Sequence, residues 1–180
     1  MTIPWNRFNK YLVAALTVAL LAGCKSSHKK QVSTFRMQVE VNPDASKLSE
    51  TISVDRQQPF MLTVERAPFL SEKNVAEAKV IDEVGGFAIT VRFDRQGSWL
   101  LNSYTAENRG VHYAIFCQWT PKPGEKLNLG RWLAAPKIMK MINSGQITFT
   151  PDATREEADQ IVIGLNNVAK KLKTAAESNW

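Results

Sequence analysis

The sequence predicts an α+β domain, in which two main helices pack on one face of an antiparallel sheet. Apolar and polar residues alternate over residues 34–41 and again over residues 87–93, as in half-buried strands. Residues 93–104 and 154–168 instead carry apolar side chains at helical spacing. These patterns give the strands and the two helices of the predicted domain.

The first half of the domain is predicted to consist mainly of strands. They are expected at residues 34–41, 50–54, 60–65 and 87–93. A turn is expected at residues 42–45, which contain Asn, Pro and Asp. Ser71 is expected to cap a short helix that runs to about Ala78. Gly85 and Gly86 mark a turn or bulge before the last of these strands.

The two main helices have clear start signals. Asp94 can cap the first, which should end near Asn108. Thr154 and Glu157 form a capping-box pattern for the second. Gly164 lies inside this second helix, where it costs about 1 kcal/mol, so we expect it to mark a close approach of backbone.

The remaining strands follow the first helix. They are expected at residues 111–119, 131–142 and 146–150. Pro136 interrupts the middle one, which favours an edge strand or a strand that turns into a short helical piece. Residues 120–130 contain two prolines and two glycines and are predicted to be a loop.

The N-terminal stretch is predicted to be a leader. Arg7 and Lys10 precede an apolar run at residues 11–21, which is too short for a bilayer span of roughly 20 residues. The following Leu21-Ala22-Gly23-Cys24 resembles the lipobox of bacterial lipoproteins, in which the cysteine is lipidated after cleavage. An apolar N-terminal helix of a cytosolic protein that happens to end in Cys is the alternative.

The lipobox resemblance implies a division of the chain. Residues 1–23 would be a cleaved signal peptide, residues 24–33 a lipidated flexible tether, and residues 34–180 a single α+β domain. Lys25 follows the cysteine where an Asp would favour the inner membrane in enteric-type bacteria, so the outer membrane is favoured. The expected location is the cell envelope, with the domain facing the periplasm.

The positive charge of the chain does not indicate a nucleic-acid partner. The net charge is +6, but five of the cations lie in the leader or the tether. These are Arg7, Lys10, Lys25, Lys29 and Lys30. The rest of the chain carries only about +1, whereas a nucleic-acid-binding domain has a basic footprint. A basic tether lying on anionic headgroups explains the imbalance better.

Catalytic and metal-binding patterns are weak. Cys117 and His112 are five residues apart on a predicted strand, so they point to opposite faces and Cys117 is best explained as a core residue. Asp152, Glu156 and Asp159 share a helical face, where a cation site competes with simple compensation of the helix dipole. We expect no catalytic residue, no metal and no cofactor, and no intramolecular disulfide once Cys24 is lipidated.

The best candidate contact surface is the loop at residues 120–130 with its flanks. The expected binding residues are Trp119, Lys122, Lys126, Arg131 and Trp132. Aromatic side chains beside an adaptable polar loop suit protein recognition. The alternative is that both tryptophans belong to the core and the loop is a long hairpin connection. Another possible mode is addition of an extended peptide to the edge strand that bears Pro136.

The second half of the chain resembles a known family. The similarity lies in the following successive motifs: Phe93-Asp94, Thr105-x-x-Asn108-x-Gly110, Ala114-Ile115, Ala134-Ala135-Pro136-x-Ile138, Gly145-Gln146-Ile147 and Thr154-x-Glu156-Glu157-Ala158. Together they resemble the head subdomain of the first periplasmic domain of SecD, the accessory subunit of the bacterial protein-export translocase, over residues 79–168.

This resemblance implies a small ferredoxin-like α+β head that handles preprotein emerging on the outer side of the membrane. Two departures stand out. The loop at residues 120–130 is longer than the tight turn usual in the family. Since no spanning segment follows the domain, we also expect no proton-driven work from this chain.

Three hypotheses of function follow. The first is a noncatalytic, lipid-anchored envelope module that assists protein export or envelope assembly by binding extended polypeptide or a translocase partner. The second is a structural envelope lipoprotein with one dedicated folded partner. The third is an envelope enzyme with an unrecognised site.

Overall fold

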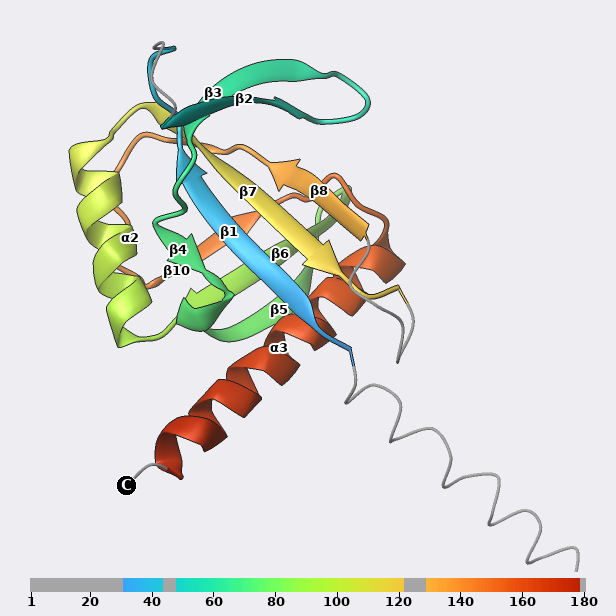
Figure 1. Cartoon of the computed structure of the whole chain (residues 1–180). Coiled ribbons are helices and arrows are strands. Elements are labelled where there is room, and N and C mark those ends of the chain that lie inside the picture. The colour runs from blue at the N-terminus through green and yellow to red at the C-terminus, as the bar shows by residue number, and fades with distance from the viewer. Residues whose placement is uncertain (1–30, 44–47, 122–128, 179–180) are drawn as a thin grey trace, which may run out of the picture.

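The computed structural model describes residues 31–43, 48–121 and 129–178. Within these residues the strands form a five-stranded sheet, a three-stranded sheet and a two-stranded hairpin (Figure 1). All pairs of strands are antiparallel. The two predicted main helices are also present, and the α+β class is therefore confirmed. Cys24 and the predicted leader and tether up to residue 30 lie outside the described residues.

The five-stranded sheet is built around two long central strands. Its strands are β1 (Ser33–Val39), β4 (Leu70–Ser71), β7 (Val111–Trp119), β8 (Leu129–Ala134) and β9 (Lys137–Ile138). The order is β4-β1-β7-β8, and β9 also pairs with β7. β8 stands at the end of this order and Pro136 follows it, which agrees with an edge strand there. The sequence predicts a single strand over residues 131–142. Of these residues, only 131–134 in β8 and 137–138 in β9 form strands.

The three-stranded sheet contains the second predicted alternation. Its strands are β5 (Val75–Glu83), β6 (Gly86–Phe93) and β10 (Gln146–Phe149), in the order β10-β6-β5. The prediction of a short helix from Ser71 to Ala78 is wrong. Only a single 3₁₀ turn, η2 (Glu72–Asn74), forms there. β5 begins directly afterwards because Val75 and Ala78 are buried against β6, and this tertiary pairing outweighs the local helix signal.

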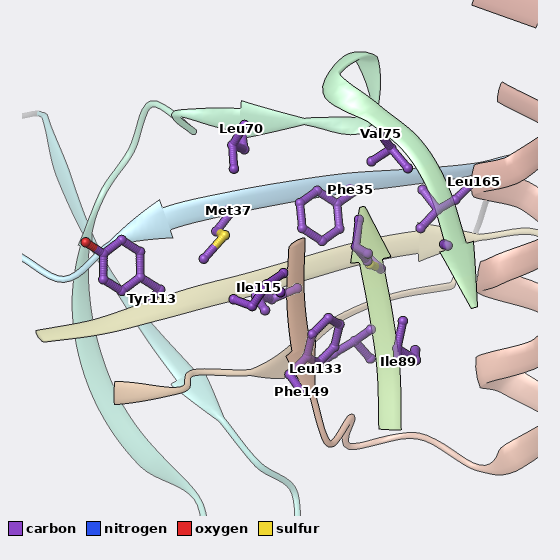
Figure 2. Close-up of a cluster of buried hydrophobic side chains, with 14 of the residues drawn as sticks. Phe35, Met37, Leu70, Val75, Ile89, Tyr113, Ile115, Leu133, Phe149 and Leu165 are labelled. Carbon is purple, nitrogen blue, oxygen red and sulfur yellow. The ribbon is translucent and has the colours of Figure 1, made fainter. Parts of the chain in front are cut away.

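The main core lies between the two larger sheets. Figure 2 shows Phe35 and Met37 of β1 and Ile115 of β7 among the side chains from β6 and β10, represented by Ile89 and Phe149. All five are at most 5% exposed. The alternation in the sequence therefore marks the inner faces of both sheets correctly.

Both helices begin where the sequence predicts. Asp94 accepts a hydrogen bond from the backbone N–H of Gly97 at 2.7 Å and caps α2 (Arg95–Glu107). Thr154 and Glu157 form the expected capping box of α3 (Arg155–Glu177). The face of α3 that enters the core consists of Ala158, Ile161 and Leu165. Neither helix is long and apolar enough, within the described residues, to span a membrane.

The central part of α3 contacts strands of both sheets at close range. A Cβ added to Gly164 would lie 2.7 Å from the backbone nitrogen of Ser33, so the predicted close approach is confirmed. The side-chain amide of Asn166 donates to the carbonyl of Ala78 and accepts from its N–H, both at 2.9 Å. This side chain therefore satisfies the outer edge of β5 much as a neighbouring strand would.

The hairpin of β2 (Ser49–Val54) and β3 (Phe60–Glu65) covers part of the outer face of the five-stranded sheet. Its buried side chains form a second, smaller cluster with Ala114 of β7, and Trp132 and Ala135 pack against that cluster. The hairpin agrees with the two predicted strands. It also brings the connection between β2 and β3 close to the edge strand β8.

Candidate functional site

A groove with a volume of about 830 Å³ lies beside the edge strand β8. Three segments that are distant in the sequence line it. They are residues 54–57 and Phe60 at the tip of the β2–β3 hairpin, residues 133–136 at the end of β8, and residues 148–154 from the end of β10 to the cap of α3. Glu83 and Ala88 of the β5–β6 hairpin complete the lining. We call this the β8 groove.

Small side chains form the β8 side of this groove. Ala134 and Ala135 are half-buried, and Leu133 is almost fully buried beneath them. Pro136 accepts a hydrogen bond from the backbone N–H of Tyr113 at 3.0 Å, which holds the segment against the sheet. Proline has no backbone N–H, and it is typical of residues near the edge of a sheet. The small side chains of Ala134 and Ala135 therefore leave space in the groove beside this segment.

The opposite wall is a tight turn at the tip of the hairpin. Asp55 has a φ of +66°, a left-handed conformation that Asp tolerates better than most residues. Its carboxylate accepts hydrogen bonds from the N–H groups of Gln57 at 2.8 Å and Gln58 at 3.3 Å. Phe60 lies just beyond the turn and is 39% exposed. An apolar ring is thus presented at the groove.

An ion pair fastens the hairpin to the third wall. The guanidinium of Arg56 lies 2.9 Å from the carboxylate of Asp152. The backbone N–H of Arg56 also donates to that carboxylate at 3.1 Å. Burial raises the pKa of Asp152, but the hydrogen bonds and charge of Arg56 outweigh it and hold the pKa below its usual range. The backbone N–H of Asp152 donates to Leu133 at 2.7 Å, so the pair connects the hairpin to β8.

Arg131 is engaged within the structure. Its guanidinium forms two hydrogen bonds of 3.1 Å with the carboxylate of Glu157 and a third with the carbonyl of Asp152. It also lies 5.4 Å from the ring centre of Trp119. Burial raises the pKa of Glu157, but Arg131 and the Thr154 backbone together hold it below its usual range. Arg131 therefore braces the start of α3 against β8 rather than presenting a free charge.

The other expected binding residues fall in different environments. Trp119 is fully buried, as in the alternative that places it in the core. Its side chain is therefore not available to a partner. Trp132 is half-buried on the outer face of the five-stranded sheet, with its ring centre 5.1 Å from that of Phe116. Lys122 and Lys126 lie outside the described residues, so their role stays a prediction.

Trp132 belongs to a second, smaller surface. A pocket of about 220 Å³ lies between the sheet and the hairpin, lined by Arg36, Gln38, Glu50, Ile52, Phe116 and Trp132. The Arg36 guanidinium stands 5.8 Å from the ring centre of Phe116. This aromatic and cationic patch adjoins the first residues of β8, on the face away from the main core.

The residues considered for catalysis are separated as the strand pattern predicts. Cys117 is 1% exposed and burial strongly raises the pKa of its thiol, so the thiol stays protonated. His112 instead pairs with Glu40 through Nδ1 at 2.8 Å. Because the two side chains lie on opposite faces of β7, they form no nucleophile and base pair.

The three acidic residues considered for a cation have other partners. Asp152 binds Arg56, Asp159 lies 3.9 Å from Arg155, and Glu156 accepts from the Thr154 hydroxyl. Within the part of the chain that the structure describes, no three His, Cys, Asp or Glu side chains are grouped to hold a metal ion.

The contact between Arg56 and Asp152 had no signal in the sequence. The two residues are 96 positions apart, and each lies in a polar stretch that resembles an ordinary loop. The sequence therefore predicts only one wall of the β8 groove, the edge strand that bears Pro136.

Comparisons with solved structures find SecDF proteins. A structure of a membrane component SecDF that enhances protein export matches with a TM-score of 0.52 and 18% identity, over 86% of this chain and 68% of that one. Two further SecDF structures, one in a super-membrane-facing form and one from Thermus thermophilus, match with TM-scores of 0.45 and 0.39 and 14% identity.

These two matches cover 90% and 91% of this chain but only 33% and 34% of those proteins, so the chain spans about a third of their length. No curated protein matches the chain. The family model for the P1 head subdomain of SecDF matches residues 21–169, which is most of the sequence. The chain therefore belongs to the SecDF P1 head subdomain family.

Proposed function

We propose that this chain is a noncatalytic, lipid-anchored module of the cell envelope that binds extended polypeptide in the β8 groove. Membership of the SecDF P1 head family relates the chain to protein export and to a periplasm-facing context. The observation that carries the proposal is the groove itself, which runs along an edge strand and has apolar side chains within it.

An extended segment suits this groove for two reasons. Edge strands bind peptides by adding a strand, because the main chain supplies affinity for any sequence while pockets accept alternate side chains. The small Ala134 and Ala135 allow such an approach, and the exposed ring of Phe60 offers apolar surface to those side chains. Such recognition is tolerant of sequence, as export of many different chains requires.

The Arg56–Asp152 pair sets the position of the hairpin wall. Its carboxylate is 14% exposed, whereas the arginine side chain is 56% exposed. An exposed ion pair of this kind contributes about 0–1 kcal/mol to stability. It therefore positions the hairpin wall without holding it rigidly. A hairpin held in this way can adapt to segments of different width.

The lipid anchor completes the proposal. Cys24 would carry the lipid, and the described domain begins at Gln31. Seven residues span at most about 25 Å when fully extended. The anchor would therefore keep the domain within a short distance of the membrane surface. We propose the outer membrane over the inner one because Lys25 rather than Asp follows Cys24.

Binding of an unfolded model polypeptide tests the groove. Fluorescence anisotropy with a labelled, permanently unfolded polypeptide should give a Kd that rises at least about tenfold in Ala135→Arg, because the new side chain fills the groove. Phe60→Ser removes exposed apolar surface without a core change and should weaken binding severalfold. Ala106→Arg, on the half-buried face of α2, is the matched control.

Equal affinity of all three variants and the parent would reject the β8 groove as the binding site. The lipid anchor is tested separately in cells. Cys24→Ser should leave the chain unprocessed or soluble, and a mature, membrane-bound form of that variant would rule the anchor out.

The patch around Trp132 supports one alternative function. Phe116 and Trp132 with Arg36 resemble the aromatic and arginine anchors of a folded partner's interface. A structural lipoprotein with one dedicated partner would use this patch. Pull-down of a single stoichiometric protein that is lost in Trp132→Ala, but retained in Phe60→Ser, would favour this alternative over the groove.

A further inference from the structure

The C-terminal turns of α3 extend beyond the rest of the domain. Every residue from Lys170 to Ser178 is exposed, whereas Leu165 is buried in the core one turn earlier. Figure 1 shows this end of α3 projecting past the edges of the sheets. A helix without packing partners is only marginally stable in water. Contact with another surface would therefore stabilise this end of α3.

The projecting end carries a concentrated positive charge. Lys170, Lys171 and Lys173 lie within four residues, and Glu177 is the one acid that follows Asp159 in α3. Among the described residues no carboxylate pairs with these lysines. Leu172 lies between them and is 41% exposed. Long cationic side chains around an apolar residue are typical of helices that lie on a membrane surface.

The N-terminal segment leaves the domain next to this end of α3. The side-chain amide of Asn167 donates to the carbonyl of Gln31 at 3.0 Å, and Ser33 lies against Gly164. Since a helix rises about 1.5 Å per residue, the three lysines lie roughly 5–10 Å along the axis from this exit point. A membrane that holds the N-terminal segment therefore also lies within reach of the lysines.

We infer that the lysine-bearing end of α3 binds the anionic headgroups of the membrane to which the chain is anchored. The orientation follows from the lipid anchor of the proposed function. The partner is an anionic lipid surface, because three unpaired cations complement negative headgroups and each strengthens binding roughly fivefold.

This contact orients the β8 groove. Residues 148–154 of the groove lie at the N-terminal end of α3, and the lysines lie at its other end. A helix of 23 residues spans about 35 Å. A membrane bound at the C-terminal end of α3 therefore leaves the groove open to the aqueous side, where it can receive an extended chain.

Vesicle binding without the lipid tests this inference. All described elements and the main core lie within residues 31–178, so the chain from residue 24 contains the whole folded unit. This chain with Cys24→Ser is mixed with vesicles of phosphatidylcholine alone, or with a minority of phosphatidylglycerol, and bound protein is measured by sedimentation. We expect binding to the anionic vesicles alone, and its loss at high salt.

Two matched triple variants locate the contact. K170Q/K171Q/K173Q should lower the partition coefficient roughly 100-fold. R109Q/K137Q/K140Q removes the same charge from exposed residues near the other end of β7, and should lower it only a fewfold. Both sets lie on the surface, so equal thermal stability verifies folding.

Equal loss in the two variants would overturn the inference, as would binding that the α3 variant retains in full. A dimer in light scattering that the α3 variant abolishes would assign this end to a second copy instead. Because the protein carries no lipid here, a failure of the anchor in cells leaves the vesicle result unchanged, and the two failures are distinguishable.

Discussion

Removal of the Asp152 carboxylate should loosen the β2–β3 hairpin without unfolding the domain. In Asp152→Ala, the Arg56 guanidinium loses an ion pair at 2.9 Å and the Arg56 backbone N–H loses an acceptor at 3.1 Å. The ion pair is worth about 0–1 kcal/mol because the arginine side chain is 56% exposed. The backbone hydrogen bond contributes about 1 kcal/mol. We expect the free energy of unfolding to fall by about 1–2 kcal/mol.

Two related variants separate these contributions. Asp152→Asn keeps an oxygen that can accept from the backbone N–H of Arg56. Its free energy of unfolding should therefore fall only about half as much as in Asp152→Ala. Arg56→Ala keeps the backbone donor, so its free energy of unfolding should fall by only about 0.5 kcal/mol. Denaturant unfolding gives the stabilities, and hydrogen exchange of residues 49–65 reports on the hairpin. Glu77→Ala, which breaks an exposed pair with Arg92, is the control and should leave hairpin exchange unchanged.

The same pair makes the hairpin sensitive to acid. Since the pKa of Asp152 is lowered in the folded state, its carboxylate stabilises the fold fully above its unfolded pKa, near 4. This contribution is lost as the pH falls through the lowered folded value. The protection factors of the hairpin amides, which correct for the intrinsic pH dependence of exchange, should therefore fall at acidic pH in the parent, and in Asp152→Ala they should not. Parent-like stability and exchange in Asp152→Ala would refute this account of the hairpin.

Three further predictions concern the framework. Gly164→Ala should lower the free energy of unfolding by about 2 kcal/mol, because its methyl group would lie 2.7 Å from the Ser33 nitrogen; unchanged stability in denaturant would contradict the close packing. Asn166→Ala should cost about 2 kcal/mol, since two backbone groups of Ala78 lose their partners, and faster exchange of the Ala78 amide would identify the cause. In the Cys24→Ser chain, the Cys117 thiol should react with a thiol reagent only on unfolding, so rapid labelling of that folded chain would exclude its burial.

Much of the fold could be predicted because it rests on local signals. Alternation at Phe35, Met37 and Val39 marks the inner face of β1, and these side chains are indeed buried. The caps at Asp94 and Thr154 give the starts of both helices because capping is decided within four residues.

The errors arose where distant residues decide local structure. A Ser followed by charged residues predicts a helix at Ser71, but burial of Val75 and Ala78 against β6 selects a strand. The division of the strands into separate sheets depends on how they pair across the chain. No alternation pattern carries that information, because it reports only which face is buried.

The candidate site could be predicted only in part for the same reason. Pro136 marks an edge strand because proline lacks a donor, and the groove does run along it. The pairing of Arg56 with Asp152 across 96 residues has no local signature. Trp119 and Trp132 are equivalent in the sequence, yet one faces the main core and the other faces outward beside Phe116.

Photo-crosslinking in cells tests the central claim most directly. A photoreactive amino acid replaces Ala135 in the β8 groove or, as a control, the exposed Trp99 on α2, and mass spectrometry identifies the adducts. If the groove binds extended polypeptide, residue 135 should give a ladder of many exported proteins and residue 99 should not. A single discrete adduct at residue 135, or the same ladder from both positions, would contradict the account.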